Sequence, residues 1–233
     1  METSDQFIYR LPHNSKTLIL GKSMSGKTRL THKLVETSII NNDFDIIIVF
    51  ASEPDFSMNY KGYLPFWHKE MKWEHVKRYV DKQAEIVKRR REEGKEPPHL
   101  LIILDDAVKY SDDFYHNHKK EWTDLFSTCR HINISIVIIL QSIAATLPPA
   151  LKDQLTRIYL FNVPGNVNNL LDYLPPVVVN GKHLKGTKFT VWYSQHVQEK
   201  GSFILFDYEY KLRIITAKLP DLIQPLRIEY ILY

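Results

Sequence analysis

A glycine-containing octapeptide near the N-terminus has the residue types of a phosphate-binding loop. Residues 21–28 read GKSMSGKT and fit G-x-x-x-x-G-K-[ST] at every fixed position. The two glycines let the backbone curl so that its N–H groups converge on a phosphate. The lysine then reaches the β- and γ-phosphates, and the threonine hydroxyl binds Mg²⁺. We therefore expect a nucleoside triphosphate to be bound by Gly21, Lys22, Ser23, Met24, Ser25, Gly26, Lys27 and Thr28.

Two adjacent carboxylates follow an apolar run further along the chain. Leu100–Leu104 is followed directly by Asp105 and Asp106. In a P-loop enzyme the first carboxylate holds the Mg²⁺ shell, and the second polarises the attacking water. Taken alone, this pattern is more typical of a solvated strand end before a turn. The phosphate loop favours the catalytic interpretation, because Asp105 as metal ligand and Asp106 as general base complete one site with Lys27.

Three further polar side chains are candidates for the same chemistry. Gln141 follows the apolar run Ile134–Leu140, where an amide can sense the γ-phosphate, although an amide there can also simply cap a strand. Arg130 precedes that run and Arg157 begins the next one. Each is a candidate arginine finger for the ATP of a neighbouring subunit. The competing interpretation for each is a cation at a helix end or on the surface.

The elements that must position these residues alternate along the chain. Short runs rich in Ile and Val, without polar alternation, are typical of parallel strands buried on both faces. They are Thr17–Leu20, Ile46–Phe50, Leu100–Leu104, Ile134–Leu140 and Ile158–Phe161. The intervening helix-like segments are Lys27–Ile40, Trp73–Glu93 and Lys119–Arg130. This alternation predicts an α/β fold of the P-loop NTPase type, with a central, mostly parallel sheet flanked by helices.

The interval between the phosphate loop and the carboxylates leaves room for an additional strand, which we assign to Ile46–Phe50. P-loop folds with such a strand, the RecA/ASCE type, are typical of motors. In the tail, Thr187–Tyr193, Phe203–Asp207 and Leu212–Thr216 are expected to be antiparallel strands added to the same sheet. We expect a single P-loop ATPase domain over residues 1–233. Its core would span about 15–165, and its C-terminal strand extension about 185–233.

Composition narrows the class of protein. Of 233 residues, 44% are apolar and 25% charged, which is ordinary for a globular chain and argues against wholesale disorder. The net charge of +4 is mild, so a basic tail is not the main device for binding nucleic acid. The single cysteine, Cys129, excludes an internal disulfide or a multi-cysteine zinc site and fits a reducing compartment. No secretory signal or membrane-spanning segment is expected, because the longest uncharged stretch, His131–Leu151, is interrupted by amides and prolines.

One basic run remains open to two interpretations. Lys88–Arg91 lies on an expected helix and runs into Glu92 and Glu93. It could track DNA phosphates, but a solvated, self-paired helix face is the favoured interpretation.

The motifs in their order resemble a known family. GKSMSGKT, LLIILDDA, FSTCRHINISIVIILQS and LPPALKDQLTRIYLF are similar to the A32-type genome-packaging ATPases of large DNA viruses, within the FtsK–HerA superfamily. The discriminating part is Arg130–Ser135 with Gln141 after the strand, because a phosphate loop alone would indicate only an NTPase. The resemblance covers roughly Thr17–Phe161, and the tail more weakly.

The resemblance implies a RecA-like core in a pentameric or hexameric ring that uses ATP and Mg²⁺ to move double-stranded DNA into a preformed capsid. It further implies docking on a capsid vertex or portal protein, and a location in the host cytoplasm or viral factory, with association with the virion. No N-terminal barrel precedes the core, which favours a compact viral motor over the cellular HerA proteins.

The sequence also bears on other classes of P-loop protein. A HerA-like DNA helicase or translocase is the main alternative. A P-loop nucleotide kinase would need an arginine-rich lid, and no arginine cluster follows the core. A guanine-reading switch usually carries Asn-Lys-x-Asp, which does not occur here. A conjugation-type coupling protein is disfavoured by the short N-terminus and the lack of a membrane segment.

Overall fold

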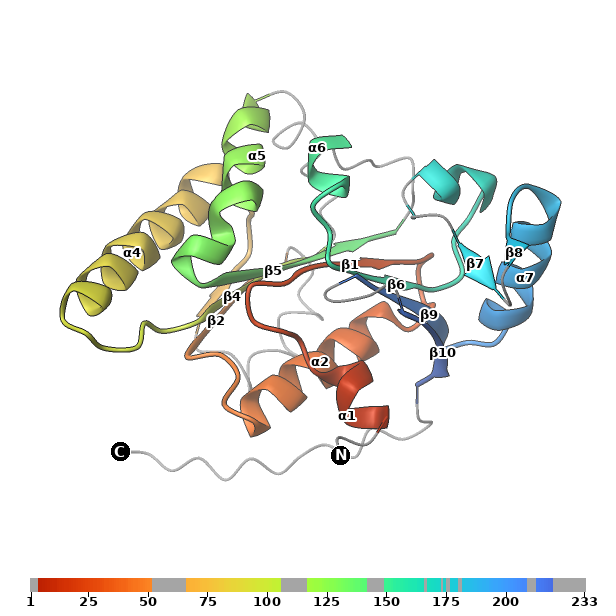
Figure 1. The fold of residues 1–233 in the computed structure, drawn as a ribbon, viewed down its shortest axis with the longest axis horizontal. Helices are drawn as coiled ribbons and strands as arrows, with labels where there is room; N and C mark the ends of the chain where they lie inside the picture. The colour runs from red at the N-terminus through yellow and green to blue at the C-terminus, as the bar shows by residue number, and fades with distance from the viewer. Residues whose placement is uncertain are drawn as a thin grey trace.

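One eight-stranded sheet forms the centre of the molecule (Figure 1). The computed structural model describes residues 4–51, 66–105, 117–141, 149–165, 167–172, 174, 177–179, 182–208 and 213–219. The strands of the sheet are β1 (Lys16–Leu20), β2 (Ile46–Phe50), β3 (Phe66–His68), β4 (Leu100–Leu104), β5 (Ile134–Leu140), β6 (Arg157–Leu160), β9 (Ser202–Asp207) and β10 (Arg213–Lys218). A separate two-stranded ribbon joins β7 (Val178–Val179) to β8 (Lys182–His183).

The helices lie on both faces of this sheet (Figure 1). They are α1 (Ser4–Tyr9), α2 (Lys27–Ile40), α4 (Trp73–Glu92), α5 (Lys119–Thr128), α6 (Pro149–Lys152) and α7 (Thr187–Val197), with 3₁₀ segments at Cys129–Ile132 and Val167–Asp172. Among the residues described, no helix has both the length and the apolar character needed to cross a membrane.

Alternate residues of the central strands pack into two different cores. On β4, Leu100, Ile102 and Leu104 join one core with α4, α5 and α7, while Leu101 and Ile103 join the other with α1 and α2. All five residues of β4 and all seven of β5 are buried. The expectation of strands buried on both faces, and with it the α/β fold, is confirmed.

The order of the strands differs from the expectation in one respect. The sheet runs β10-β9-β6-β1-β5-β4-β2-β3, and the strands from β6 to β3 are parallel. The strand that lies between the loop-bearing β1 and the carboxylate-bearing β4 is therefore β5. Ile46–Phe50 does intervene in the sequence, but it pairs with the outer side of β4. Order along the chain does not fix order in space, because a crossover helix can carry a strand past its neighbour.

The prediction of one of the three tail strands is wrong. Thr187–Tyr193 belongs to α7, which covers β9 rather than pairing with it. The segment is rich in β-branched and aromatic residues, which explains the prediction of a strand. Its buried residues, Phe189, Tyr193 and Val197, recur every fourth position and form one face of a helix, so tertiary packing overrides the local propensity.

The other two tail strands are confirmed as antiparallel additions. The strand β9 pairs antiparallel with β6, and β10 pairs antiparallel with β9. The C-terminal extension thus continues the central sheet on the side of β1 that lies away from β4.

Candidate nucleotide site

The phosphate loop is held by the strands on either side of β1. The Gly21 N–H donates to the carbonyl oxygen of Leu140 at the end of β5, at 3.2 Å. The Lys22 N–H donates to the carbonyl oxygen of Asn162 just after β6, at 2.7 Å. Because both partners are main-chain groups at strand ends, the sheet itself sets the position of the loop.

Both loop glycines are required by the space around them. A Cβ on Gly21 would lie 2.5 Å from Phe161 Cβ and 2.7 Å from Ser25 Oγ. Gly26 has a φ of 116°, in the left-handed region that favours glycine, and a Cβ there would meet Leu219 at 3.1 Å. The glycine pattern read from the sequence therefore has a steric cause in this structure.

Lys27 places its ammonium group at the loop. It is the first residue of α2, it is only 8% exposed, and its Nζ donates to the carbonyl oxygens of Gly21 at 2.7 Å and Lys22 at 2.9 Å. The positive end of the α2 dipole lies at the same place. A buried cation beside a helix N-terminus forms a site for an anionic group.

The acidic strand end lies at the same edge of the sheet. Asp105 directly follows β4, and its N–H donates to the carbonyl oxygen of Phe50 at 2.8 Å. Only β5 separates β4 from β1, so Asp105 lies about 10 Å across the sheet from β1, at two interstrand spacings. Gln141 follows β5 at this edge and is exposed. Lys27, Asp105 and Gln141 are therefore brought together, while Asp106 lies outside the described residues.

The two candidate arginine fingers occupy different environments. Arg130 is exposed and precedes β5, at the edge of the sheet opposite the phosphate loop. Arg157 is 2% exposed; its guanidinium donates to Asp207 Oδ2 at 2.9 Å and to the carbonyl oxygen of Arg10 at 2.5 Å. The structure therefore does not support an arginine finger at Arg157, because its guanidinium already forms a buried ion pair with Asp207 of the same chain. The competing interpretation of Arg157 as a surface cation is also wrong, because the residue is buried.

The residues at the site fit ATP and Mg²⁺. The Ser25 side chain is 6% exposed, and its buried hydroxyl has no hydrogen-bond partner among the described residues. The glycine positions leave a cradle that a Cβ would fill. The Thr28 hydroxyl and the Asp105 carboxylate are oxygen donors, which Mg²⁺ prefers, with the remaining positions taken by water and phosphate.

This fold and loop define a P-loop ATPase in which one strand, β5, lies between the loop strand and the carboxylate strand. The chain belongs to the poxvirus A32 protein family, whose model matches residues 8–208. The family resemblance found in the sequence is thereby confirmed. No curated protein sequence matches the chain.

Solved structures with the same fold include two viral proteins and a conjugation coupling protein. The DNA-packaging ATPase B204 of Sulfolobus turreted icosahedral virus is 13% identical, covering 90% of this chain and all of its own, with a TM-score of 0.64. The packaging NTPase B204 of Sulfolobus turreted icosahedral virus 2, solved with AMPPCP, is 12% identical over 90% of this chain and 99% of its own, with a TM-score of 0.58. The pCW3 conjugation coupling protein TcpA is 14% identical over 88% of this chain and 61% of its own, with a TM-score of 0.58.

Sequence reasoning missed the residues that support the loop from the β6 side. The Tyr193 hydroxyl donates to the carbonyl oxygen of Phe161 at 2.7 Å and accepts from the Val163 N–H at 2.9 Å. Burial raises the pKa of Tyr193 far above its usual value, so the phenol stays protonated. Asn162, between them, could have been found by the rule that singled out Gln141, since both are amides directly after a parallel strand.

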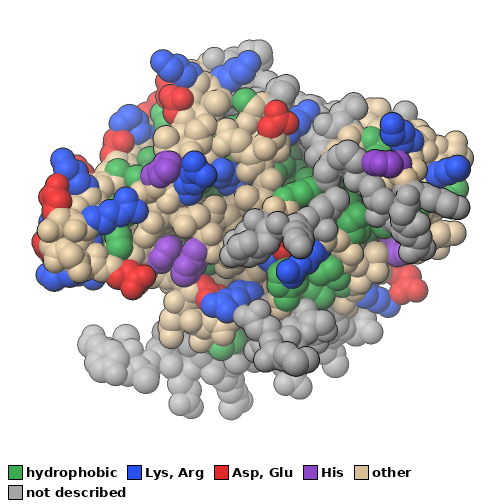
Figure 2. Space-filling model, viewed as in Figure 1, with side chains coloured by type: hydrophobic (Ala, Val, Ile, Leu, Met, Phe, Trp, Pro, Cys, Tyr) green, Lys and Arg blue, Asp and Glu red, His purple; other side chains and the backbone are tan. Residues whose placement is uncertain are grey.

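The basic run Lys88–Arg91 lies in the last turns of α4 with Lys88, Arg89 and Arg91 exposed, and Arg90 Nε donates to the carbonyl oxygen of Glu96 at 3.1 Å. Lys77 pairs with Asp81, and Lys82 pairs with Glu85 at 3.2 Å, along the same helix. Figure 2 shows cationic and anionic side chains interspersed over this end of the molecule. Opposite charges are therefore mixed over this part of the surface, which favours a solvated helix face. Pairing of the run Lys88–Arg91 with Glu92 and Glu93 stays a prediction.

Proposed function

We propose that this chain is an ATP-hydrolysing motor that translocates double-stranded viral DNA into a preformed capsid. The observation that carries the proposal is the meeting of Lys27 and Asp105 at one sheet edge, with β5 between their strands, in a member of the A32 family. The two B204 proteins of similar fold, a DNA-packaging ATPase and a genome-packaging NTPase, support the same role.

Each residue at the site has a definite part in hydrolysis. The loop N–H groups and Lys27 bind the triphosphate, and Thr28 with Asp105 would hold Mg²⁺, which neutralises charge on the transferring phosphoryl group. Asp106 accepts a proton from the attacking water, and Gln141 senses the γ-phosphate from the end of β5. Because Lys27 now donates to Gly21 and Lys22, binding exchanges two carbonyl partners for phosphate oxygens.

The other candidate arginine finger, Arg130, supports assembly into a ring. Arg130 is exposed on the edge opposite the loop of its own chain, so it can serve only the nucleotide of a neighbouring subunit. We accordingly propose a pentameric or hexameric ring that docks on a capsid vertex or portal protein. It would act in the host cytoplasm or viral factory and associate with the virion.

A HerA-like translocase that works outside packaging is the second candidate. The shared fold with the coupling protein TcpA favours it, because that similarity extends beyond viral proteins. The two candidates differ in partner: only a packaging motor binds assembled capsids of its own virus.

The proposal is tested by steady-state ATP turnover with and without double-stranded DNA, together with the mass of the protein in solution. We expect DNA to stimulate turnover, and a multimer that carries Arg130 of one subunit to the nucleotide of the next. ATP turnover that DNA does not change would contradict the proposed motor function. Co-sedimentation with purified capsids then distinguishes a packaging motor from the second candidate.

A further inference from the structure

The part of the chain that leads into α7 and forms it carries positive charge without negative charge. Residues 173–198 contain three lysines and two histidines but no aspartate or glutamate. At the chain's average frequency of 27 acidic residues in 233, a stretch of this length would contain about three. The mixing of charges found on α4 is therefore missing from this sequence, and charge of one sign favours an anionic partner.

The structure places these cations at the surface. His183, Lys185 and Lys188 are exposed, on β8, just after it and in the first turn of α7. Within the described part of the chain no carboxylate pairs with Lys185 or Lys188, whereas exposed lysines elsewhere, such as Lys95, pair with glutamate. Figure 2 shows Lys and His side chains, without acidic ones between them in that view, over the end of the molecule that carries β8 and α7.

The outer side of α7 is rich in hydrogen-bonding groups. Thr187, Lys188 and Gln195 are exposed there, and hydroxyl, ammonium and amide groups are those that contact phosphate oxygens. Among the residues of α7, Val191 is the only large apolar side chain that is exposed, at 50%. The centre of a protein–protein interface is usually apolar and aromatic, so this surface suits a nucleic-acid backbone better than a protein.

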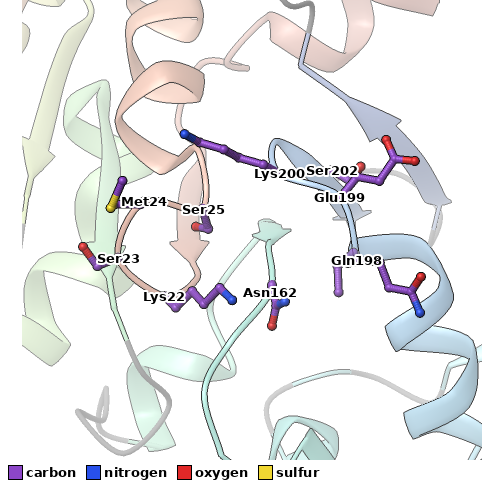
Figure 3. Close-up of a pocket in the computed structure, with 10 residues that line it drawn as sticks. Lys22, Ser23, Met24, Ser25, Asn162, Gln198, Glu199, Lys200 and Ser202 are labelled. Atoms are coloured by element: carbon purple, nitrogen blue, oxygen red, sulfur yellow. The ribbon is translucent and has the colours of Figure 1, made fainter.

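The same helix is joined to the phosphate loop on its buried side. The Tyr193 hydroxyl holds the backbone on either side of Asn162, whose carbonyl oxygen accepts from the Lys22 N–H. After α7 ends, the Gly201 N–H donates to the carbonyl oxygen of Ser25 at 3.1 Å. Figure 3 shows the turn that follows α7 beside the loop, and the two enclose a cavity of about 230 Å³. A shift of the loop therefore reaches α7 through hydrogen-bonded backbone, with space for the movement.

We propose that the α7 surface, formed by residues 183–188 and the outer side of α7, contacts the phosphate backbone of double-stranded DNA, and that α7 links this contact to the phosphate loop. The 11 residues of α7 make a helix about 16 Å long, which spans about five base pairs of a duplex. Phosphate contacts carry no sequence information, which suits a motor that moves along any DNA. The inference rests on the proposed motor function and adds the place where DNA is held.

Anisotropy of a fluorescently labelled DNA duplex, measured at several salt concentrations, tests the contact. Lys185→Gln combined with Lys188→Gln removes two cations that pair with no carboxylate among the described residues. DNA binding should weaken at least about tenfold at about 0.1 M salt, and the slope of log K against log[salt] should fall in magnitude by about 1.8 for each subunit in contact with the duplex. Lys185→Arg with Lys188→Arg keeps both charges and should bind within about twofold of wild type.

Lys77→Gln combined with Lys82→Gln is the matched control. It removes the same charge from exposed lysines of α4, which pair with Asp81 and Glu85. It should bind DNA within about twofold of wild type. Equal weakening by the two double variants would overturn the inference, because the net charge of the protein rather than the α7 surface would then explain the effect.

Failure of this inference and failure of the motor function give different results. If the wild-type protein does not bind DNA, the proposed motor fails and the inference fails with it. If the wild-type protein binds DNA and the α7 double Gln variant binds it equally tightly, the motor stands and DNA is held elsewhere. A variant that keeps DNA binding but no longer co-sediments with purified capsids would assign the surface to a protein partner and would also overturn the inference.

The link to the phosphate loop has its own measurement. Coupled binding is reciprocal, so a non-hydrolysable ATP analogue that shifts α7 must change the Kd of DNA, and DNA must change the Kd of the analogue by the same factor. We expect a change of at least about fivefold in the wild-type protein. A Kd of DNA that is the same with and without the analogue would overturn the link.

Discussion

Tyr193 supports the phosphate loop from a distance, and its hydroxyl can be removed without changing the ring that packs in the core. The hydroxyl bridges the carbonyl oxygen of Phe161 and the N–H of Val163, on either side of the residue that bonds Lys22. The side chain is 2% exposed. Tyr193→Phe therefore leaves two buried main-chain groups to find new partners in a place that water reaches poorly.

The size of the effect follows from those two groups. A buried polar group left without a partner costs about 1–3 kcal/mol. We expect Tyr193→Phe to lower the free energy of unfolding by about 2–4 kcal/mol in total, which for a chain of this length lowers Tm by about 5–15 °C. Because the same backbone holds Lys22, a loss of about 1 kcal/mol in phosphate binding should raise the Kd of ATP about fivefold.

Scanning calorimetry measures the first effect and titration with ATP the second. Tyr79→Phe is the control: its hydroxyl also makes one side-chain hydrogen bond, to His68 at 2.6 Å, but on the opposite side of the sheet from the loop's β6 support. It should leave ATP binding unchanged. A Tm for Tyr193→Phe within about 1 °C of wild type would refute the reasoning, since no buried group would then have lost its partner.

Substitutions at the site and in the core should separate ATP binding, hydrolysis and folding. Lys27→Ala removes charge-assisted hydrogen bonds worth about 1.5–3 kcal/mol and should raise the Kd of ATP at least about tenfold in titration. Asp106→Asn should keep ATP binding but slow turnover by about 10²–10⁴-fold, and unchanged turnover would remove Asp106 as the base. Asp207→Ala leaves the buried Arg157 guanidinium without its counter-ion and should destabilise the fold by about 3–5 kcal/mol in denaturant unfolding, whereas replacing both residues with apolar ones should restore much of that loss. Burial lowers the pKa of His32 below its usual 6.5, so the stability that the neutral ring contributes is present above pH 6.5 and is lost as pH falls below it; His32→Gln should flatten this dependence in unfolding curves.

The sequence predicts the central sheet well because each strand can be recognised from its own run of apolar residues. Runs such as Leu100–Leu104 and Ile134–Leu140 are apolar on both faces, and burial on both faces leaves little choice but a covered parallel sheet. The phosphate loop is also predictable, because its glycines mark positions where a Cβ would crowd Phe161 or Leu219.

What the sequence does not predict depends on contacts between distant residues. The sequence of α7 favours a strand, because its local propensity opposes the helical packing of its buried face. The burial of Arg157 depends on Asp207, fifty positions away and on a strand that pairs antiparallel with its own. The cavity beside the loop is likewise formed by residues that meet only when the tail joins the sheet, so no local pattern marks it.

The most direct test is a structure of the protein with a non-hydrolysable ATP analogue and Mg²⁺. The account predicts that the phosphates lie on the loop at 21–28, that Lys27 has left the carbonyl oxygens of Gly21 and Lys22 to contact them, and that the metal lies between Thr28 and Asp105. A triphosphate bound elsewhere, with Lys27 still bonded to the loop, would contradict it.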